Sequence, residues 1–305
     1  MSVRPLVILI LLLGGLVDVG RANETAVLVV SSERSAAYEQ AAEAVAGQLP
    51  RREVQQSTVA DLPAYRGPAP RLYVALGTEA CASLARATPA PAPVLCALLP
   101  RASFERVQRE AGRRAGASFS ALYLNQPLGR QLDLVRLALP QARRVGVLWG
   151  PDSQANEAQL QAAAQTRGMR VLGVPVRGDE PVYSSLRKVL EESDLLLALA
   201  DPQIYNSGSI QNILLASFRA QVPMLAFSPA YVRAGALMAV YSTPAQIGQQ
   251  AGVLARGVLA GQPLGQPQHP LQFEVSVNEH VARSLGLKLD AENLAEQLRR
   301  LERGS

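Results

Sequence analysis

The side chains best suited to holding a small ligand stand directly after short apolar runs, where a buried strand would end. Six of them are candidate ligand-binding residues: Ser32, Thr78, Arg101, Ser153, Asp201 and Tyr231. Serine and threonine hydroxyls, together with the free N–H groups at the start of a helix, suit a carboxylate. Asp201 suits an ammonium group, and Tyr231 would pack on the body of the ligand. The set favours a small zwitterion.

Each candidate also has a structural alternative. Ser, Thr and Asp before a helix are ordinary N-caps, so only their convergence on one cleft would favour binding. Asp201 follows the apolar run 195–200, and two interpretations of it are equally open: it caps a loop, or it contacts a ligand. Arg101 would favour an anionic ligand if it faced the cleft, and otherwise would point to solvent.

Functions other than binding find little support. The sequence has no G-x-S-x-G, no G-x-G-x-x-G and no P-loop. His269 lies in a Pro-rich loop and His280 follows a predicted strand, so we expect both at the surface. Two His and two Cys are too few for most zinc sites. We therefore expect no catalytic residue, no metal and no cofactor. The charge of +5 is dispersed, which argues against nucleic acid as a partner.

The first residues predict export. Residues 5–17 are uncharged and apolar, a span that suits the core of a signal peptide and is shorter than the ~20 residues of a membrane-spanning helix. Gly20 and Ala22 are small residues at the two positions that a signal peptidase reads, so we place the cut between Ala22 and Asn23. The alternative is an uncleaved N-terminal anchor. The sequence thus predicts a periplasmic protein.

The remaining chain alternates apolar runs with amphipathic stretches. We expect strands at residues 26–31, 71–76, 93–99, 116–124, 144–150, 169–176, 194–201, 222–228, 236–242 and 271–277. Helices are expected at residues 35–49, 79–87, 104–111, 127–138, 153–167, 181–192, 209–220 and 245–259. Such alternation with short turns predicts a doubly wound parallel α/β fold. The strands are too many for one comfortable open sheet, which favours two lobes.

Breaks near residues 124–127 and 241–244 divide the chain between these lobes, and a third crossing is expected near 271–277. We expect one lobe from residues 23–124 with 244–270, and the other from residues 125–243 with 271–305. Lobes joined by several crossings form a hinge with a cleft between them.

Several segments carry a family resemblance. They are GTEA at 77–80, ALPQARRVGVLWGPDSQAN at 138–156, DLLLALAD at 194–201, VPMLAFSPAYVRAGALMAVYSTPAQIGQQAG at 222–252, VLAGQPLGQPQ at 258–268 and VSVNEHVARSLGLKL at 275–289. In this order the chain resembles the ABC-transporter substrate-binding proteins of the tryptophan- and tyrosine-binding type, which have the type I periplasmic binding protein-like fold. The family commonly has Asp-Pro where this chain reads Leu99, Pro100, Arg101.

The resemblance implies a solute-binding protein that captures an amino acid or small carboxylate for an ABC importer. Its partners would be that small molecule and a membrane permease, and we expect a monomer. The alternative is a periplasmic sensory or accessory module of the same fold, with diverged or lost ligand binding, that signals to a membrane receptor.

Cys81 and Cys96 leave two interpretations. An even pair in an oxidising compartment indicates a disulfide. Cys81 opens the helix after one predicted strand, and Cys96 lies inside the next strand. Because the interiors of parallel strands seldom form bridges, we favour two small buried hydrophobic side chains.

Overall fold

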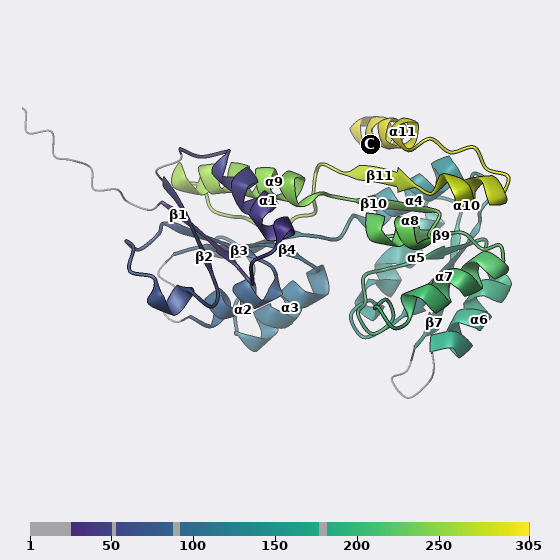
Figure 1. Ribbon diagram of the computed structural model, residues 1–305, viewed down its shortest axis with the longest axis horizontal. Coiled ribbons are helices and arrows are strands. Elements are labelled where there is room, and N and C mark those ends of the chain that lie inside the picture. The colour runs from purple at the N-terminus through teal and green to yellow at the C-terminus, as the bar shows by residue number, and fades with distance from the viewer. Residues whose placement is uncertain (1–25, 51–52, 88–91, 177–181, 305) are drawn as a thin grey trace, which may run out of the picture.

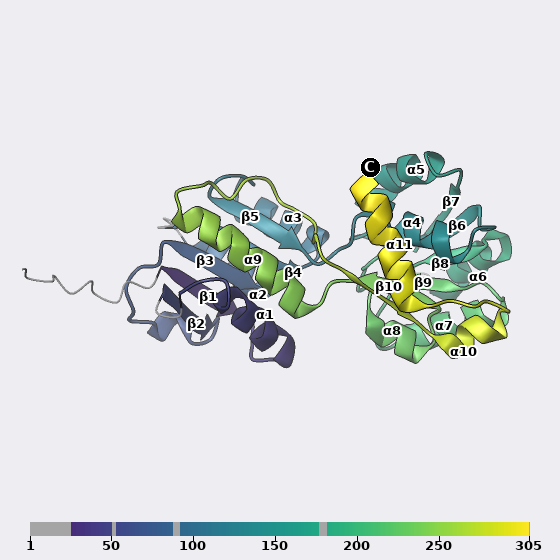
Figure 2. The ribbon, with the colours of Figure 1, turned by 90° about the horizontal axis from the view of Figure 1, so that it is seen from above.

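The computed structural model describes residues 26–50, 53–87, 92–176 and 182–304. Its chain forms two α/β lobes joined by a narrow connection, and Figures 1 and 2 show them side by side along the longest axis of the molecule. The predicted two-lobed α/β architecture is thereby confirmed. The predicted signal peptide, residues 1–22, lies outside the described residues.

The first lobe is built on a five-stranded parallel sheet of order β2-β1-β3-β4-β5. Its strands are β1 (Val27–Ser31), β2 (Val54–Thr58), β3 (Leu72–Leu76), β4 (Val94–Leu99) and β5 (Phe119–Tyr123). Runs such as VLVVS and LYVAL are buried on both faces because helices cover each side of the sheet. The order reverses at β1, which lies between β2 and β3.

Two helices cover each face of this sheet. α1 (Ala36–Ala46) and α9 (Pro244–Leu259) lie on one face, and α2 (Thr78–Arg86) and α3 (Arg101–Glu110) lie on the other. A short 3-10 helix, η2 (Leu62–Ala64), follows β2. α1 and α9 touch along their backbones, since a Cβ on Gly248 would come within 2.3 Å of the Ala41 carbonyl oxygen. A Cβ on Gly252 would likewise lie 2.9 Å from the Val45 carbonyl oxygen. α9 follows β10 of the second lobe in the chain, so these close contacts pack a late segment of the chain onto the first lobe.

The second lobe is built on a six-stranded sheet of order β11-β10-β9-β8-β6-β7. Its strands are β6 (Arg144–Trp149), β7 (Arg170–Pro175), β8 (Leu195–Leu197), β9 (Met224–Ala226), β10 (Met238–Tyr241) and β11 (Glu274–Val277). Five of them repeat the strand order of the first lobe, with the reversal at β6. β11, which lies within the expected strand 271–277, pairs antiparallel with β10, whereas a parallel sheet was expected.

Helices again cover both faces. α4 (Leu128–Ala138), α5 (Glu157–Gln165) and α11 (Ala291–Gly304) share one apolar core, and α6 (Val182–Glu192), α7 (Ile210–Arg219) and α8 (Pro229–Ala234) share the other. α10 (Glu279–Ser284) packs beside the first group, and the 3-10 helix η3 (Gln154–Asn156) precedes α5. The Trp149 side chain, at the end of β6, is fully buried in this first core.

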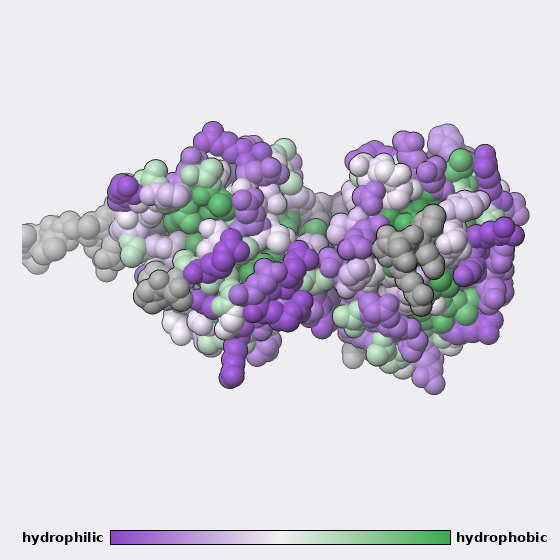
Figure 3. All heavy atoms as spheres, turned by 90° about the horizontal axis from the view of Figure 1, so that it is seen from below, coloured by the Kyte–Doolittle hydropathy of each residue, from purple (hydrophilic) through white to green (hydrophobic). Residues whose placement is uncertain are grey.

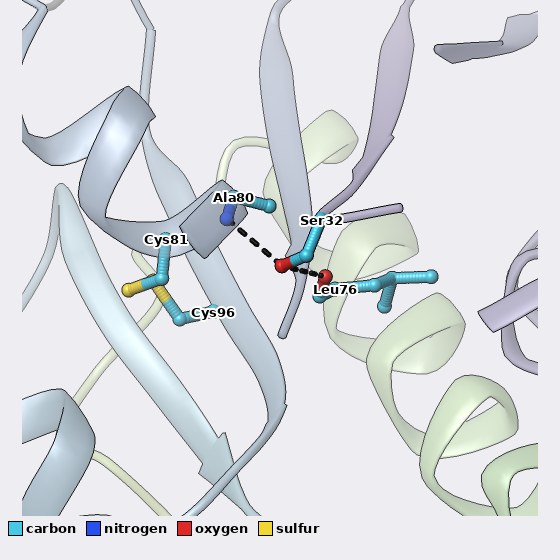
Figure 4. The surroundings of a disulfide bond; sticks show 5 residues. All are labelled: Ser32, Leu76, Ala80, Cys81 and Cys96. Atoms are coloured by element: carbon cyan, nitrogen blue, oxygen red, sulfur yellow. Dashed lines mark hydrogen bonds between the residues drawn. A yellow bond between two sulfur atoms is a disulfide. The ribbon is translucent and has the colours of Figure 1, made fainter. Parts of the chain in front are cut away.

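A disulfide joins Cys81 of α2 to Cys96 of β4, so the favoured interpretation of two free thiols was wrong. Figure 4 shows the bond crossing from the first turn of the helix to the neighbouring strand. α2 packs directly over β4, which brings the two Cα atoms to 5.4 Å, a separation that a disulfide spans without movement of the backbone. Both side chains are buried, as that interpretation had expected.

Candidate functional site

A pocket of about 150 Å³ lies between the two lobes. The first lobe borders it with the start and one face of α3, and the second with the loop after β6 and the chain after β8. Its charged and polar lining residues are Arg101, Glu105, Arg106, Arg109, Asn125, Gln126, Gln131, Asp152, Asn156, Gln159 and His269. In the second lobe this is the point where the strand order reverses, a common place for ligands in open α/β sheets.

A second compartment, also of about 150 Å³, adjoins the first. The two share the lining residues Pro100, Asn125, Gln126, Gln131, Leu199 and Ala200. Leu124, Ala198, Phe227 and Val240 line only the second compartment and make it largely apolar. The site thus offers a charged end and an apolar end.

Arg101 is the predicted site residue that the structure places in the pocket. It begins α3 directly after Pro100, and its backbone N–H donates to Asn125 Oδ1 at 2.7 Å. Its guanidinium donates to Glu105 Oε1 at 2.7 Å and to Gln159 Oε1, across the pocket in the second lobe, at 3.3 Å. The hydrogen bond to Glu105 raises the pKa of Arg101, so the side chain carries its charge at any physiological pH.

Asp201 is not available to a ligand in this structure. Its side chain belongs to a residue only 2% exposed, and Oδ2 accepts hydrogen bonds from the Asp152 N–H and from the Ser153 N–H and hydroxyl. Oδ1 accepts from the Gln203 N–H at 3.1 Å. Gly150 permits this approach, because a Cβ there would lie 2.5 Å from Asp201 Oδ2. The predicted pair Ser153 and Asp201 therefore holds the β6 and β8 loops together instead of presenting polar groups to the pocket.

Ser32 and Thr78 are brought together at the other strand-order reversal, beside β1 and β3. The Ser32 hydroxyl accepts from the Ala80 N–H at 3.0 Å and donates to the Leu76 carbonyl at 3.1 Å, as Figure 4 shows. Thr78 begins α2 and is half-buried. Neither residue lines the two compartments, which border β4 and β5 of this lobe.

Tyr231 lies one layer behind the apolar compartment. Its hydroxyl donates to the Tyr205 carbonyl at 3.2 Å, and its ring meets the edge of Phe227 with centroids 5.0 Å apart. Phe227, which the sequence had not singled out, is the aromatic residue of this group that lines the compartment. Tyr231 thus supports the wall and does not form it.

His269 is a half-buried residue of the pocket, so the expectation of a surface histidine was wrong. Its Nδ1 lies 2.9 Å from the Asn125 carbonyl oxygen, and its ring packs against Tyr123. Burial lowers the pKa of His269, and the nearby charges of Arg101 and Arg130 lower it further, although the hydrogen bond to Asn125 raises it. The Pro-rich loop around it runs beside β5, where the Tyr123 N–H donates to the Gln268 carbonyl. His280, by contrast, is exposed as expected.

The three chain crossings between the lobes share one set of hydrogen bonds. Gln126 of the first crossing donates to Ser242 Oγ of the second at 2.8 Å. Ser242 Oγ in turn donates to the Gln272 carbonyl of the third at 2.6 Å. Arg130 donates to Gln126 Oε1 at 2.7 Å and to the Pro270 carbonyl at 2.9 Å. These polar groups join the segments that must bend if the lobes move.

Three further lining residues, Asn125, Gln126 and Gln131, were not predicted from the sequence and lie at and just after the first crossing. The available signal was an Asn-Gln-Pro stretch between a buried strand and an amphipathic helix.

In the described ranges no group of three or more acidic, His or Cys side chains is placed to hold a metal ion. Within those same ranges, no helix has the length and apolar character needed to cross a bilayer.

Comparison with known proteins gives a family match over most of the chain. The family model described as ABC transporter substrate binding protein matches residues 52–298. One curated relative, the tyrosine-binding protein of Clostridioides difficile (strain R20291), is 24% identical over 173 residues, which are 55% of this chain and 50% of that protein. The match therefore spans about half the length of that relative.

Solved structures share the fold. A ligand-free, open substrate-binding protein with adhesive properties from Clostridium difficile has a TM-score of 0.65 at 15% identity, over 87% of this chain and 96% of that one. An ABC domain from Streptococcus pneumonia in complex with L-Trp has a TM-score of 0.61 at 17% identity, over 89% and 97%. A conserved domain protein from Vibrio cholerae also reaches 0.61, at 18% identity, over 89% and 98%.

Proposed function

Because the chain belongs to the family of ABC transporter substrate-binding proteins, we propose that it captures a small ligand between its two lobes and delivers it to the permease of an ABC importer. The observation that carries this proposal is the pocket that both lobes line. A ligand held by both lobes binds a closed form better than an open one, and the permease can read that difference.

We propose an amino acid or a small carboxylate as the ligand class. Relatives of this chain include a tyrosine-binding protein and a protein solved in complex with L-Trp, and both of these ligands are amino acids. The site here joins a charged compartment to an apolar one, which suits a small molecule with a polar group at one end. We infer that Arg101, Asn125 and Phe227 contact it.

We assign residues 23–124 with 244–270 to the first lobe and residues 125–243 with 271–305 to the second. Supporting this division, α9 packs on α1, and Gln268 forms a bridge beside Leu122. β11, in contrast, pairs with β10 of the second sheet.

We further infer that residues 1–22 are a signal peptide removed after Ala22, and that the mature protein acts in the periplasm as a monomer without catalysis.

A thermal-shift screen of the mature chain against amino acids and small carboxylates tests the proposal. A ligand should raise the melting temperature, because it binds the folded protein only. Small-angle scattering with that ligand should then show a smaller radius of gyration as the lobes close. Absence of any stabilising compound, or saturation without compaction, would contradict capture by closure.

A further inference from the structure

The face of α3 that borders the pocket is basic. Arg101, Glu105 and Arg109 recur every fourth residue and Arg106 lies beside them, so all four side chains point to one side of the helix. Seen from below in Figure 3, strongly hydrophilic residues gather on the first lobe next to the constriction between the lobes. Three guanidinium groups therefore face a pocket that only two carboxylates, those of Glu105 and Asp152, also line.

Each of these carboxylates already has a guanidinium partner. Glu105 Oε1 lies 2.7 Å from Arg101 Nε, and Asp152 Oδ1 lies 3.6 Å from Arg106 Nη1. Asp201 lies behind this wall and is buried. Its carboxylate accepts hydrogen bonds from backbone N–H groups of the β6 and β8 loops. Arg109 forms no ion pair within the part of the chain that the structure describes. Among the described lining residues, three guanidinium groups thus face two carboxylates, and each carboxylate already pairs with an arginine. One positive charge of the pocket is left without a counter-ion, so the pocket favours an anionic group over an ammonium group.

The start of α3 adds to this positive character. Pro100 has no side-chain group to cap the helix, and the first turn contains no acidic residue; the neutral Asn125 side chain accepts from the Arg101 N–H. The partial positive charge at the helix N-terminus is therefore not neutralised by an acidic side chain of the first turn, and Pro100, Arg101 and Ala102 line the pocket wall there. An anionic group placed there would meet both this dipole and the guanidinium groups.

The adjoining compartment defines the rest of the ligand. Leu124, Ala198, Phe227 and Val240 offer it apolar surface, and the shared residues Asn125 and Gln131 stand between the two ends. Gln131 donates its Nε2 to the Gln126 carbonyl, so its amide is fixed in place. The wall beyond that amide suits a hydrocarbon or aromatic body and offers no charged partner.

We propose that the ligand is a small organic anion with an apolar body and without an ammonium group, held at its carboxylate or phosphate end by Arg101 and Arg109. This inference rests on the proposed capture function and specifies its substrate class. It separates this chain from a receptor for zwitterionic amino acids, in which an ammonium group needs a carboxylate partner.

Titration calorimetry with matched ligands tests the inference. 3-Phenylpropionate and phenylalanine have the same body and carboxylate, and only phenylalanine carries the ammonium group. We expect 3-phenylpropionate to bind at least about tenfold more tightly, because binding would desolvate the ammonium without pairing it. Phenyl phosphate, as a third probe, distinguishes a phosphate site from a carboxylate site.

Arg109→Gln should weaken the binding of 3-phenylpropionate about five- to tenfold. Arg114→Gln is the matched control, because it removes the same charge from an exposed residue that does not line the pocket. Equal or tighter binding of phenylalanine would overturn the inference and leave the capture function standing. If none of the three probes binds, the inference is also overturned, and the wider screen alone decides whether the protein captures ligands.

Discussion

At the scale of single residues, Asp201 acts as a structural carboxylate. Four donors from its own and a neighbouring loop surround it, and the residue is almost fully buried. We expect Asp201→Ala to lower the free energy of unfolding by about 2 kcal/mol or more, because the buried N–H groups lose their acceptor. Urea denaturation measures this. Asp152→Ala, which removes a more exposed carboxylate from the neighbouring β6 loop, should cost less.

An Asp201→Ala protein that is as stable as the wild type but binds its ligand poorly would return Asp201 to the binding site. The sequence could not decide between these roles, since a carboxylate after an apolar strand has the same pattern in both. The deciding information is the path of the β6 loop, which brings the Ser153 N–H and hydroxyl to Asp201 from a distant part of the chain.

His269 should make stability depend on pH. Burial, then the charges of Arg101 and Arg130, hold the folded-state pKa of His269 below its unfolded value of about 6.5. Between these two values the unfolded chain binds the proton more readily, so the free energy of unfolding should rise with pH through that window. The contribution is complete above the unfolded pKa and is lost as the pH falls through the folded one.

Urea denaturation at several pH values between about 5 and 8 measures this dependence, with His269→Gln as the comparison. The wild type should lose more stability than the variant as the solution is acidified. Parallel stability curves for the two proteins would show that His269 makes no such contribution.

At the scale of elements, the disulfide fastens α2 to β4 in the core of the first lobe. It joins residues 15 positions apart. For a loop of this length the chain-entropy model gives a stabilisation of about 3 kcal/mol. We expect chemical reduction to lower the free energy of unfolding of the wild type by that order, as followed by denaturant titration with and without reductant. The double variant Cys81→Ala with Cys96→Ala is the control and should not respond to reductant.

Elements were predictable where burial dictated the residue pattern. β1 and β3 are mainly apolar because both of their faces are covered. α9 was predicted from its small residues between a proline and a Gly-rich loop. β2, with the sequence VQQST, was missed because an edge strand that is only partly buried needs no apolar run. α11 was not predicted although its apolar stripe is clear. It follows the last strand, so it is not part of the strand–helix–strand alternation from which the other helices were predicted.

The site was less predictable than the fold for a topological reason. Ser32 and Thr78 were predicted because they directly follow expected strands, and they do lie where the strand order of the first lobe reverses. The crossings between the lobes join the chain beside β5, however, and the pocket opens near them, between Asn125 and Ala200. Which edge of a sheet faces the partner lobe depends on contacts between distant segments, and no local pattern encodes these.

At the scale of the whole molecule, α11 is tied to the crossings between the lobes. Glu302 near its end accepts hydrogen bonds from Arg130 at 2.5 and 3.0 Å, and Arg130 is only 6% exposed. The guanidinium also lies over the Phe273 ring, 4.3 Å from its centroid. We expect Glu302→Ala to lower the free energy of unfolding by about 1–3 kcal/mol, because it leaves a largely buried charge without its counter-ion.

Glu296→Ala is the matched control on the same helix. Its partner Arg300 is exposed, and such surface pairs contribute at most about 1 kcal/mol. Thermal unfolding of both variants in parallel provides the comparison. Equal effects of the two substitutions would mean that α11 is an ordinary surface helix without a special link to the crossings.

Polar contacts between α3 and the second lobe should set how far the lobes stand apart without ligand. Arg106 pairs with Asp152 at 3.6 Å and Arg101 donates to Gln159 at 3.3 Å, and both contacts are partly exposed. An exposed pair contributes at most about 1 kcal/mol, equivalent to a roughly fivefold change in the balance of open and closed forms. We therefore expect Asp152→Asn to increase the radius of gyration of the ligand-free protein modestly in small-angle scattering.

Salt should act in the same direction, since about 1 M salt screens charges beyond about 3 Å. Glu191→Gln, which breaks an exposed pair with Arg187 inside the second lobe, is the control and should leave the radius of gyration unchanged at low salt. If Asp152→Asn and its control scatter alike, and added salt does not expand the wild type, the contacts between α3 and the second lobe do not hold the lobes together. Bending at the hydrogen-bonded crossings would then set the opening by itself.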